Sequence, residues 1–352
     1  MGYEDGWAAL NLDMPFKIPR TEFSLTEHWP LIEVVTGVHA DQNSNIVEKA
    51  EASAAIMKAW DFGLIWNVLV LNQYYKGRVT NMGHAQWSAG GGDLNRDVHC
   101  PFSTPEEVLA YDPMEENGLY ERERLISDFL GHYNLFKNYY PDAVNMSGTY
   151  VSLFSGMINI FGWEMLLLAG GVDMAGLGQV VLRYEKWINQ FFEAYAETDI
   201  PVMMVHDDIT WASGPVFPPA WYREYIFPAY KRLWAPVIEA GKKIIFTSDG
   251  DYTMFMSDIV DCGAHCLVME PLTDMAAFAE RYGQTHSFIG NADTRILLIG
   301  SREEIRAEVE RCINIGKNCP GFILAVGNHI PPNTPVESAL YYNEIFEELR
   351  YR

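Results

Sequence analysis

The sequence has few basic residues for its length. Its 352 residues include 25 Lys and Arg against 47 Asp and Glu, which gives a formal net charge of −22 at pH 7. A chain this acidic repels nucleic acid and anionic membrane surfaces, and it carries no basic stripe that would bind either one. We therefore expect neither a nucleic-acid-binding protein nor a membrane-surface protein.

Cysteines and long apolar runs are also scarce. The five cysteines form an odd, scattered set, which suits reduced thiols better than a disulfide framework. No stretch approaches the roughly 20 uninterrupted apolar residues that cross a bilayer, and the first 13 residues lack the basic flank and apolar core of a signal peptide. The sequence favours a cytoplasmic protein.

A glycine-rich phosphate loop is missing after the early strand-like runs, whereas a regular alternation of strand-like and helix-like segments is present. Five short apolar runs in the second half are each followed by a helix-like segment: 201–205, 243–246, 266–269, 287–289 and 322–326. Runs at 64–70 and 144–147 bring the predicted strands to seven, and we expect an eighth. This alternation implies parallel pairing. Polar residues after every run favour a (β/α)8 TIM-type barrel over a doubly wound open sheet.

We interpret residues 1–352 as a single barrel domain. Residues 1–45, which prolines interrupt, are predicted to be an irregular N-terminal extension that wraps the barrel. Residues 74–103 are rich in Gly, Asn, His and aromatic residues and lack a regular period, so we place this loop over the barrel mouth. The alternative for the loop is a surface hairpin without a chemical role.

Capping residues mark several helix boundaries. Helices are predicted over Asn45–Ala59 and Met174–Ala196, and Ser301 with Glu304 forms a capping box. Gly283, just past the helix predicted over 274–282, is expected to be a left-handed C-terminal cap.

Polar or acidic residues follow each of the five runs: His206-Asp207-Asp208, Ser248-Asp249-Gly250-Asp251, Glu270, Asn291-Ala292-Asp293 and Asn328-His329. In a β/α barrel the carboxyl ends of the strands meet at one mouth, where the chemistry takes place. Carboxylates at close range cannot all stay ionised without a cation or a shared proton. The mouth is therefore expected to hold one or the other.

Oxygen and imidazole ligands suit zinc or another divalent ion. We predict the metal ligands from His206, Asp249, Glu270 and His329, and the catalytic proton-transfer groups from Asp208, Asp249, Asp293 and His329. The alternative for each acid is a helix N-cap. The alternative for His206 is a hydrogen-bonded packing residue.

Aromatic residues make up 13% of the chain, and several fall at or just after predicted strand ends. Trp and Tyr that line a pocket suit a flat aromatic or macrocyclic ligand. We predict substrate contacts from Trp66, Tyr150, Trp211 and Asn291. Ordinary packing is the alternative for each of them.

The second half carries several motifs that resemble one superfamily. They are the segments 218–228, 246–251, Met269-Glu270-Pro271, 290–293 and 327–335, with weaker matches at 18–22 and 35–37. Together they resemble the uroporphyrinogen decarboxylase superfamily. The resemblance implies a β/α barrel, and either decarboxylation or methyl transfer to or from a cobalamin carried on a separate corrinoid protein.

Two departures from the superfamily's patterns discriminate between these activities. The decarboxylases' arginine-rich N-terminal motif, which meets the substrate's carboxylates, is absent, and the matching region offers only Arg20. The thiol-methylating branch binds zinc through a His-x-Cys pair where this chain has Thr247-Ser248-Asp249, and through a further Cys where it has Asn328. A zinc-thiolate mechanism therefore does not carry over to this chain.

The Ser248-Asp249-Gly250-Asp251 version resembles the branch grouped with anaerobic aryl-ether-demethylating methyltransferases. It implies O-demethylation, in which a methyl group moves from a small methoxylated, aromatic substrate to the Co(I) of a corrinoid protein. A homodimer is compatible with the sequence. Cofactor-free decarboxylation of a small or tetrapyrrole acid is the second hypothesis, and a non-catalytic corrinoid or tetrapyrrole binder is the third.

Overall fold

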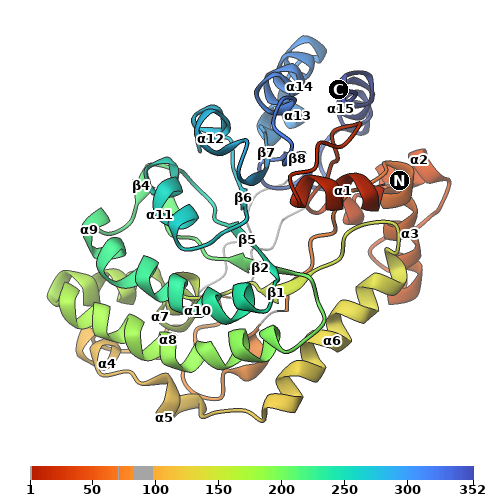
Figure 1. Cartoon of the computed structure of the whole chain (residues 1–352). Coiled ribbons are helices and arrows are strands. Elements are labelled where there is room, and N and C mark those ends of the chain that lie inside the picture. The colour runs from red at the N-terminus through yellow and green to blue at the C-terminus, as the bar shows by residue number, and fades with distance from the viewer. Residues whose placement is uncertain (1, 70, 83–97) are drawn as a thin grey trace.

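The computed structural model describes residues 2–69, 71–82 and 98–352 (Figure 1). Its strands are β1 (Ser147–Thr149), β2 (Val202–His206), β3 (Thr210–Trp211), β4 (Gly214–Pro215), β5 (Lys243–Thr247), β6 (Cys266–Val268), β7 (Ser287–Ala292) and β8 (Phe322–Val326). The helices of the first half are α1 (Gly2–Leu10), α2 (Trp29–Thr36), α3 (Ile46–Ala59), α4 (Pro105–Leu109), α5 (Pro113–Asn117), α6 (Arg122–Tyr139), α7 (Phe154–Val172) and α8 (Met174–Ala196).

The helices of the second half alternate with the strands. They are α9 (Pro219–Trp221), α10 (Phe227–Glu239), α11 (Met256–Asp261), α12 (Met275–Tyr282), α13 (Thr294–Ile299), α14 (Arg302–Gly316) and α15 (Val336–Leu349). The helix predicted over Met174–Ala196 is confirmed at both ends, and Asn45 and Ser301 each form the side-chain and backbone bonds of a capping box. Gly283 is right-handed with a φ of −60°, so the left-handed cap predicted there is wrong.

Six strands form one parallel sheet in the order β1-β2-β5-β6-β7-β8, with helices around it (Figure 1). Two N-terminal segments complete the barrel. Leu64 forms a parallel bridge to Val144, shortly before β1, and Leu69 forms one to Thr149 of β1. Arg20 forms a parallel bridge to Leu324 of β8. These two segments also meet, because Gly63 N donates to Arg20 O at 2.8 Å and Thr21 Oγ1 donates to Leu64 O at 3.0 Å. Six strands plus two segments make the predicted (β/α)8 barrel.

The barrel interior is filled by alternate residues of each strand, as the two-residue period of a strand requires. Met146, Met204, Ile245 and Ile323 belong to this inner core, while their sequence neighbours pack outward against the helices. Helix α1 covers one end of the barrel, since Ala9 and Leu10 join the inner core and Ser287 Oγ of β7 donates to Ala9 O at 2.8 Å. The opposite end, at the carboxyl ends of the strands, is the mouth.

The N-terminal extension predicted to be irregular over residues 1–45 contains α1, α2 and the segment that closes the barrel. Pro15 lies between α1 and the closing segment, and Pro30 lies in the first turn of α2, where a helix tolerates proline, so these prolines do not exclude the elements. The run predicted as a strand over 64–70 forms only isolated bridges. The β3–β4 hairpin was not predicted, since each of its strands has two residues.

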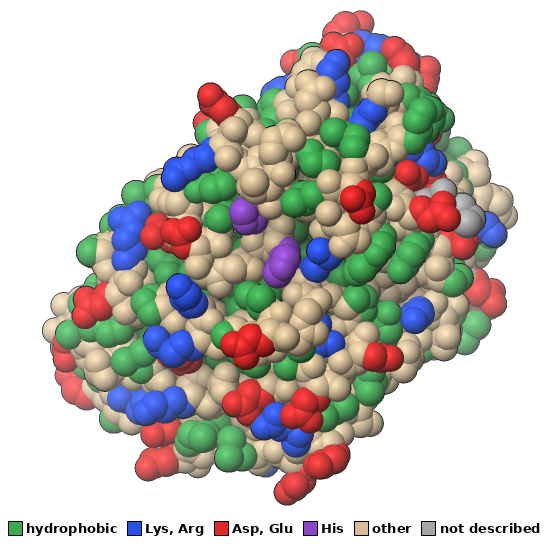
Figure 2. All heavy atoms as spheres, in the orientation of Figure 1, with side chains coloured by type: hydrophobic (Ala, Val, Ile, Leu, Met, Phe, Trp, Pro, Cys, Tyr) green, Lys and Arg blue, Asp and Glu red, His purple; other side chains and the backbone are tan. Residues whose placement is uncertain are grey.

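Half of the predicted mouth loop 74–103, namely residues 83–97, lies outside the described residues. Its described ends pack on α7: Thr80 Oγ1 donates to Asn159 O at 2.5 Å, and Cys100 Sγ donates to Phe161 O at 3.0 Å. Helix α7 is the one described helix that is long and apolar enough to cross a membrane, and 61% of its most apolar window is buried inside the protein. Such burial is typical of a core helix. On the face shown in Figure 2, acidic and basic side chains are interspersed.

Candidate functional site

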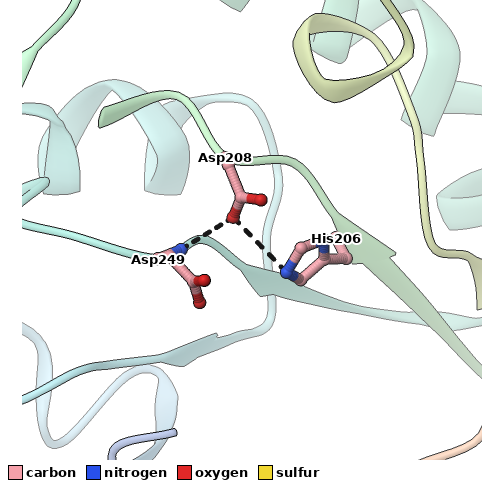
Figure 3. A group of neighbouring side chains, drawn as sticks. All are labelled: His206, Asp208 and Asp249. Atoms are coloured by element: carbon pink, nitrogen blue, oxygen red, sulfur yellow. Dashed lines mark hydrogen bonds and ion pairs between the residues drawn. The ribbon is translucent and has the colours of Figure 1, made fainter. Parts of the chain in front are cut away.

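His206 ends β2 at the barrel mouth, where its ring is held on two sides. The ring stacks on Tyr150 with a centroid separation of 4.4 Å and an interplanar angle of 9°. Nδ1 lies 3.0 Å from the Tyr150 carbonyl oxygen, which can only accept, so Nδ1 carries a proton. Nε2 points to Asp208 Oδ1 at 3.4 Å (Figure 3). Fixing one imidazole nitrogen in this way leaves the other aimed at the site.

Asp208 and Asp249 complete a group with His206 (Figure 3). Asp208 Oδ1 accepts a hydrogen bond from Asp249 N at 2.9 Å, and Asp208 N donates to Ser155 Oγ at 2.6 Å. One ligand atom of each of the three side chains lies within 4.8 Å of the other two. Neighbouring strands therefore bring two carboxylates and an imidazole together.

The loop that carries Asp249 is clamped by the β3–β4 hairpin. Thr210 Oγ1 donates to Asp249 O at 3.0 Å, and Asp251 N donates to Trp211 O at 3.1 Å. Gly250 has a φ of +81°, and a Cβ added there would lie 2.5 Å from Trp211 O. Only glycine allows this close approach of the loop to the hairpin.

Glu270 follows β6 and joins the loops on either side of it. Its Oε2 accepts from Gly250 N at 2.7 Å, and its Oε1 accepts from Asn328 Nδ2 at 2.5 Å. Burial raises the pKa of Glu270 more than these hydrogen bonds lower it. Glu270 therefore holds the loop of Asp249 through the backbone of Gly250 and adds a carboxyl group near it.

The pKa values of Asp249 and His206 are both raised. Crowding by protein atoms, followed by repulsion from Asp208 and Glu270, raises the pKa of Asp249 to about 8. Its carboxylate also reaches solvent at the mouth, and the water there screens part of this repulsion. Burial alone would lower the pKa of His206, but Asp208 and Asp249 together raise it. The site therefore retains protons that isolated side chains would release.

His329 also lies at the mouth, in the loop after β8. Its Nδ1 lies 2.5 Å from Ser24 Oγ, and its ring meets Phe23 edge-on at 5.1 Å. Ser24 has a φ of +60°, which is uncommon for a residue with a Cβ. Sequence reasoning did not identify Phe23 or Ser24, because no local pattern connects them with a histidine 305 positions away.

A cavity of about 50 Å3 lies at the mouth, with room for a few water molecules or a small functional group. Five of the predicted site residues line it, namely Trp66, Tyr150, His206, Asp249 and His329. The other lining residues are Phe23, Thr247, Val268, Val326, Gly327 and Asn328. Among the metal candidates, His206 and Asp249 group with Asp208, whereas Glu270 bonds Asn328 and His329 contacts Ser24.

Three predicted residues lie elsewhere. Asp293 caps α13 and pairs with Arg295 at 2.6 Å, which lowers its pKa and keeps it ionised. Asn291 is buried and bonds Arg311 and the backbone after β6. Trp211 is 44% exposed, and its ring is tilted against that of Trp163 with a centroid separation of 5.3 Å, outside the cavity. Their catalytic and substrate-binding roles remain predictions.

Two other strand-end acids have local partners instead of reaching the site. Asp207 is fully buried, accepts three backbone N–H bonds at the start of α7 and also accepts from Tyr230 Oη. Asp251 accepts from Thr253 N at 3.0 Å. The helix-capping alternative therefore holds for part of the acidic set.

The donor set of His206, Asp208 and Asp249 fits a divalent cation. Two carboxylates offset the charge of the ion, and the imidazole has its second nitrogen fixed by a carbonyl oxygen, as metal-binding histidines usually do. Nitrogen and oxygen donors in this ratio suit zinc or a first-row transition metal.

A (β/α)8 barrel with an acidic, imidazole-containing pocket at its strand ends defines the class of the molecule: a β/α barrel protein whose polar residues gather at its mouth. Residues 148–349 match the uroporphyrinogen decarboxylase (URO-D) family. This match covers more than half of the chain, and the chain belongs to that family.

The chain is similar to curated uroporphyrinogen decarboxylases over part of its length. The enzyme of Thermus thermophilus is 28% identical over 160 residues, which are 46% of this chain and 45% of that protein. The enzyme of Geobacter sulfurreducens is 25% identical over 186 residues, or 53% and 52%. The alignments thus span about half the length of the curated relatives.

A solved structure resembles the whole chain. A methyltransferase from Methanosarcina mazei superposes over 99% of this chain and 98% of that one, with a TM-score of 0.63 and 17% sequence identity. At this identity the likeness establishes the shared fold and not a shared activity.

Proposed function

We propose that this protein transfers the methyl group of a small methoxylated, aromatic substrate to the Co(I) of a partner corrinoid protein. The observation that supports this most directly is the group of His206, Asp208 and Asp249 at the mouth. Breaking an aryl methyl ether leaves negative charge on the ether oxygen, and that group can neutralise it with a cation or a proton. The Ser248-Asp249-Gly250-Asp251 motif supports the same branch of the family.

His206 Nε2 and the carboxylates of Asp208 and Asp249 would hold the divalent ion. When bound, the ion supplies Lewis-acid stabilisation of the leaving oxygen. Tyr150 fixes the orientation of His206 through its carbonyl oxygen and its ring. The Ser155 hydroxyl accepts a hydrogen bond from the backbone N–H of Asp208 and so orients that residue. These contacts prepare the site before a substrate arrives, so little reorganisation is needed during the reaction.

When no ion is bound, Asp249 can instead act as the proton donor, because its raised pKa favours the protonated acid near neutral pH. In the proposed step the methyl carbon–oxygen bond breaks and its electron pair stays on the oxygen. The carbon forms its new bond to Co(I), which supplies the electron pair. The oxygen then takes a proton, and the product is a phenol.

The walls of the cavity suit the aromatic part of such a substrate. Trp66 and Tyr150 present ring surfaces, while Val268 and Val326 provide apolar contacts. The cavity is small, which fits a methoxy group entering it with the aromatic ring at its entrance.

Porphyrinogen decarboxylation has less support from the site. The described residues that line the cavity include no Lys or Arg to meet a polycarboxylate. Arg20, the one arginine of the matching N-terminal region, has no exposed surface and pairs with Glu22 at 2.8 Å. A polyanion would meet Asp249, Asp208 and Glu270 without a compensating charge.

The test is metal analysis of the purified protein followed by a spectroscopic assay. Free cob(I)alamin and 2-methoxyphenol are mixed with the protein, and formation of methylcobalamin is recorded. We expect a divalent ion to co-purify and Asp249→Asn to slow methyl transfer by roughly 100-fold. Asp274→Asn is the matched control, because Asp274 is an exposed N-cap of α12 and Asn caps helices equally well.

Two outcomes would support a different function. Absence of methyl transfer from a panel of methoxylated aromatics, together with carbon dioxide release from an added acid, would favour the decarboxylase. Tight binding of a corrinoid or tetrapyrrole without turnover, unaffected by Asp249→Ala or His329→Ala, would favour the non-catalytic binder. Asp293→Asn in the same assay tests the remaining prediction for Asp293.

A further inference from the structure

Thr247 places a buried hydroxyl beside the metal-binding group. The residue is 9% exposed, and its Oγ1 has no hydrogen-bond partner in the described part of the chain. It ends β5 and lies opposite His206 in the register of β2 and β5. Its side chain lines the same cavity as His206 and Asp249.

The direction of this side chain follows from the strand period. Ile245, two residues earlier, belongs to the inner core of the barrel, and Phe246 packs outward against Trp234 with a centroid separation of 5.9 Å. Successive residues alternate between the two faces, so Thr247 points inward like Ile245. The Thr247 side chain therefore points into the barrel and not toward the helices.

A buried hydroxyl without a partner is costly to keep, and one beside a cavity can be satisfied by a ligand. Val268 and Val326, which line the same cavity, offer no polar atom, and no polar group of the described residues bonds the Thr247 hydroxyl. The hydroxyl is thus a hydrogen-bond donor at a place where an oxygen atom of a bound molecule would lie.

We propose that Thr247 Oγ donates a hydrogen bond to the oxygen atom that loses its methyl group. This inference rests on the proposed function and deepens it by naming the substrate class: Thr247 selects oxygen-linked over sulfur-linked methyl donors. As the carbon–oxygen bond breaks, its electron pair moves to the oxygen, which becomes a stronger acceptor for this hydrogen bond. Sulfur is a weaker acceptor, so a methyl thioether gains less from the hydroxyl.

The test compares Thr247→Val with Thr247→Ser. Methyl transfer to cob(I)alamin is measured for 2-methoxyphenol and 2-(methylthio)phenol, and phenol binding is measured separately by tryptophan fluorescence. We expect Thr247→Val to lower kcat/KM for the methoxy compound roughly 10- to 100-fold, with a much smaller loss for the thioether. It should also weaken phenol binding about 10-fold. Thr247→Ser, which keeps the hydroxyl, should restore both values.

Thr149→Val is the matched control. Thr149 is also a buried threonine whose Oγ1 has no partner in the described part of the chain, but it does not line the cavity. It pairs with the outward-facing Val205, so its side chain points to the helices. The control variant should retain the oxygen-to-sulfur preference of the wild type.

The two proposals fail in different ways. If the wild type transfers methyl groups and Thr247→Val leaves both the oxygen-to-sulfur preference and phenol binding unchanged, the role of Thr247 is overturned while the proposed function stands. If no methyl transfer occurs but Thr247→Val still weakens phenol binding, the function fails while the oxygen contact stands. A wild type that neither transfers methyl groups nor binds phenol overturns both.

Discussion

The protonation of His206 and Asp249 determines how the site responds to pH. The pKa values of His206 and Asp249 are raised, so both groups hold protons that the unfolded chain releases. A divalent cation would displace these protons, because metal ligands bind in their deprotonated forms. Metal affinity should therefore increase with pH.

The first prediction concerns stability without metal. Asp249 and Glu270 have folded pKa values above those of the unfolded chain, so their stabilising contribution is complete below about pH 4 and is lost as pH rises through the folded pKa. His206 has the same sign, with its contribution complete below about pH 6.5. We expect the Tm of chelator-treated protein to fall between pH 5 and pH 8, and added Zn2+ to reverse much of that fall.

Thermal unfolding at four pH values, with chelator or with Zn2+, checks this expectation. Asp249→Asn removes one of the titrating groups, so the pH dependence of its metal-free Tm should be shallower than that of the wild type. If the difference between the metal-loaded and metal-free Tm stayed constant across this pH range, it would contradict the expectation that the ion displaces protons from the site.

At this scale the sequence predicted which polar side chains lie near the mouth but identified only some of their partners. Strand-end position alone placed His206, Asp208, Asp249 and His329 near the mouth. The prediction named Asp208 and not its neighbour Asp207, but no local pattern explains that difference, because it depends on which backbone N–H groups lie within reach. The capping role of Asp207 at the start of α7 is a tertiary contact.

The N-terminal segment Ile18–Glu22 acts as one element of the barrel wall. Glu22 Oε2 accepts from Val326 N at 2.9 Å, at the end of β8, and Glu22 Oε1 accepts from Arg20 and from Tyr342 of α15 at 2.8 Å each. Arg20 also lies over the rings of Trp60 and Phe346, with its central carbon 4.5 and 4.8 Å from the centroids. One fully buried ion pair therefore joins the start of the chain to its end.

The second prediction is that Glu22→Gln destabilises the fold by about 3 to 5 kcal/mol, because it leaves the charge of Arg20 buried without a counterion. Urea denaturation measures the loss. Glu344→Gln removes one side of an exposed pair, whose side chains are 65% and 67% exposed, and should cost less than about 1 kcal/mol. Similar losses in the two variants would show that burial does not govern the Arg20 pair.

The β3–β4 hairpin is the second element on which the site depends. The third prediction is that Gly250→Ala weakens Zn2+ binding at least about 10-fold, because the added Cβ meets the carbonyl of Trp211 and shifts the loop of Asp249. Isothermal titration calorimetry measures the affinity.

Gly241→Ala is the control for the backbone effect, since Gly241 also has a positive φ of +76° but has no atom within 4 Å of the place that a Cβ would occupy. It should cost about 1 kcal/mol of stability and leave Zn2+ binding as it is. Equal losses of affinity in the two glycine variants would rule out the clamp and point to backbone strain alone.

Over the whole molecule, charge and shape together restrict the substrates. The net charge of −22, the acids of the mouth and the burial of Arg20 all disfavour a polyanionic substrate. The fourth prediction is that uroporphyrinogen is not decarboxylated above the background rate, as measured by carbon dioxide release and by chromatography of the porphyrin products. Turnover of uroporphyrinogen would show that the acidic mouth does not exclude it.

The sequence by itself determined the alternation of strands and helices, hence the parallel barrel, and the acidic character of its mouth. These features depend on local periodicity and on residue type, and both can be read directly from the amino-acid sequence. Only the tertiary structure showed that Ile18–Glu22 and the segment at 63–69 close the barrel, and that Asp208 joins His206 and Asp249 while Asp293 pairs with Arg295. Those arrangements depend on contacts between distant parts of the chain, where several short segments compete for the same hydrogen bonds.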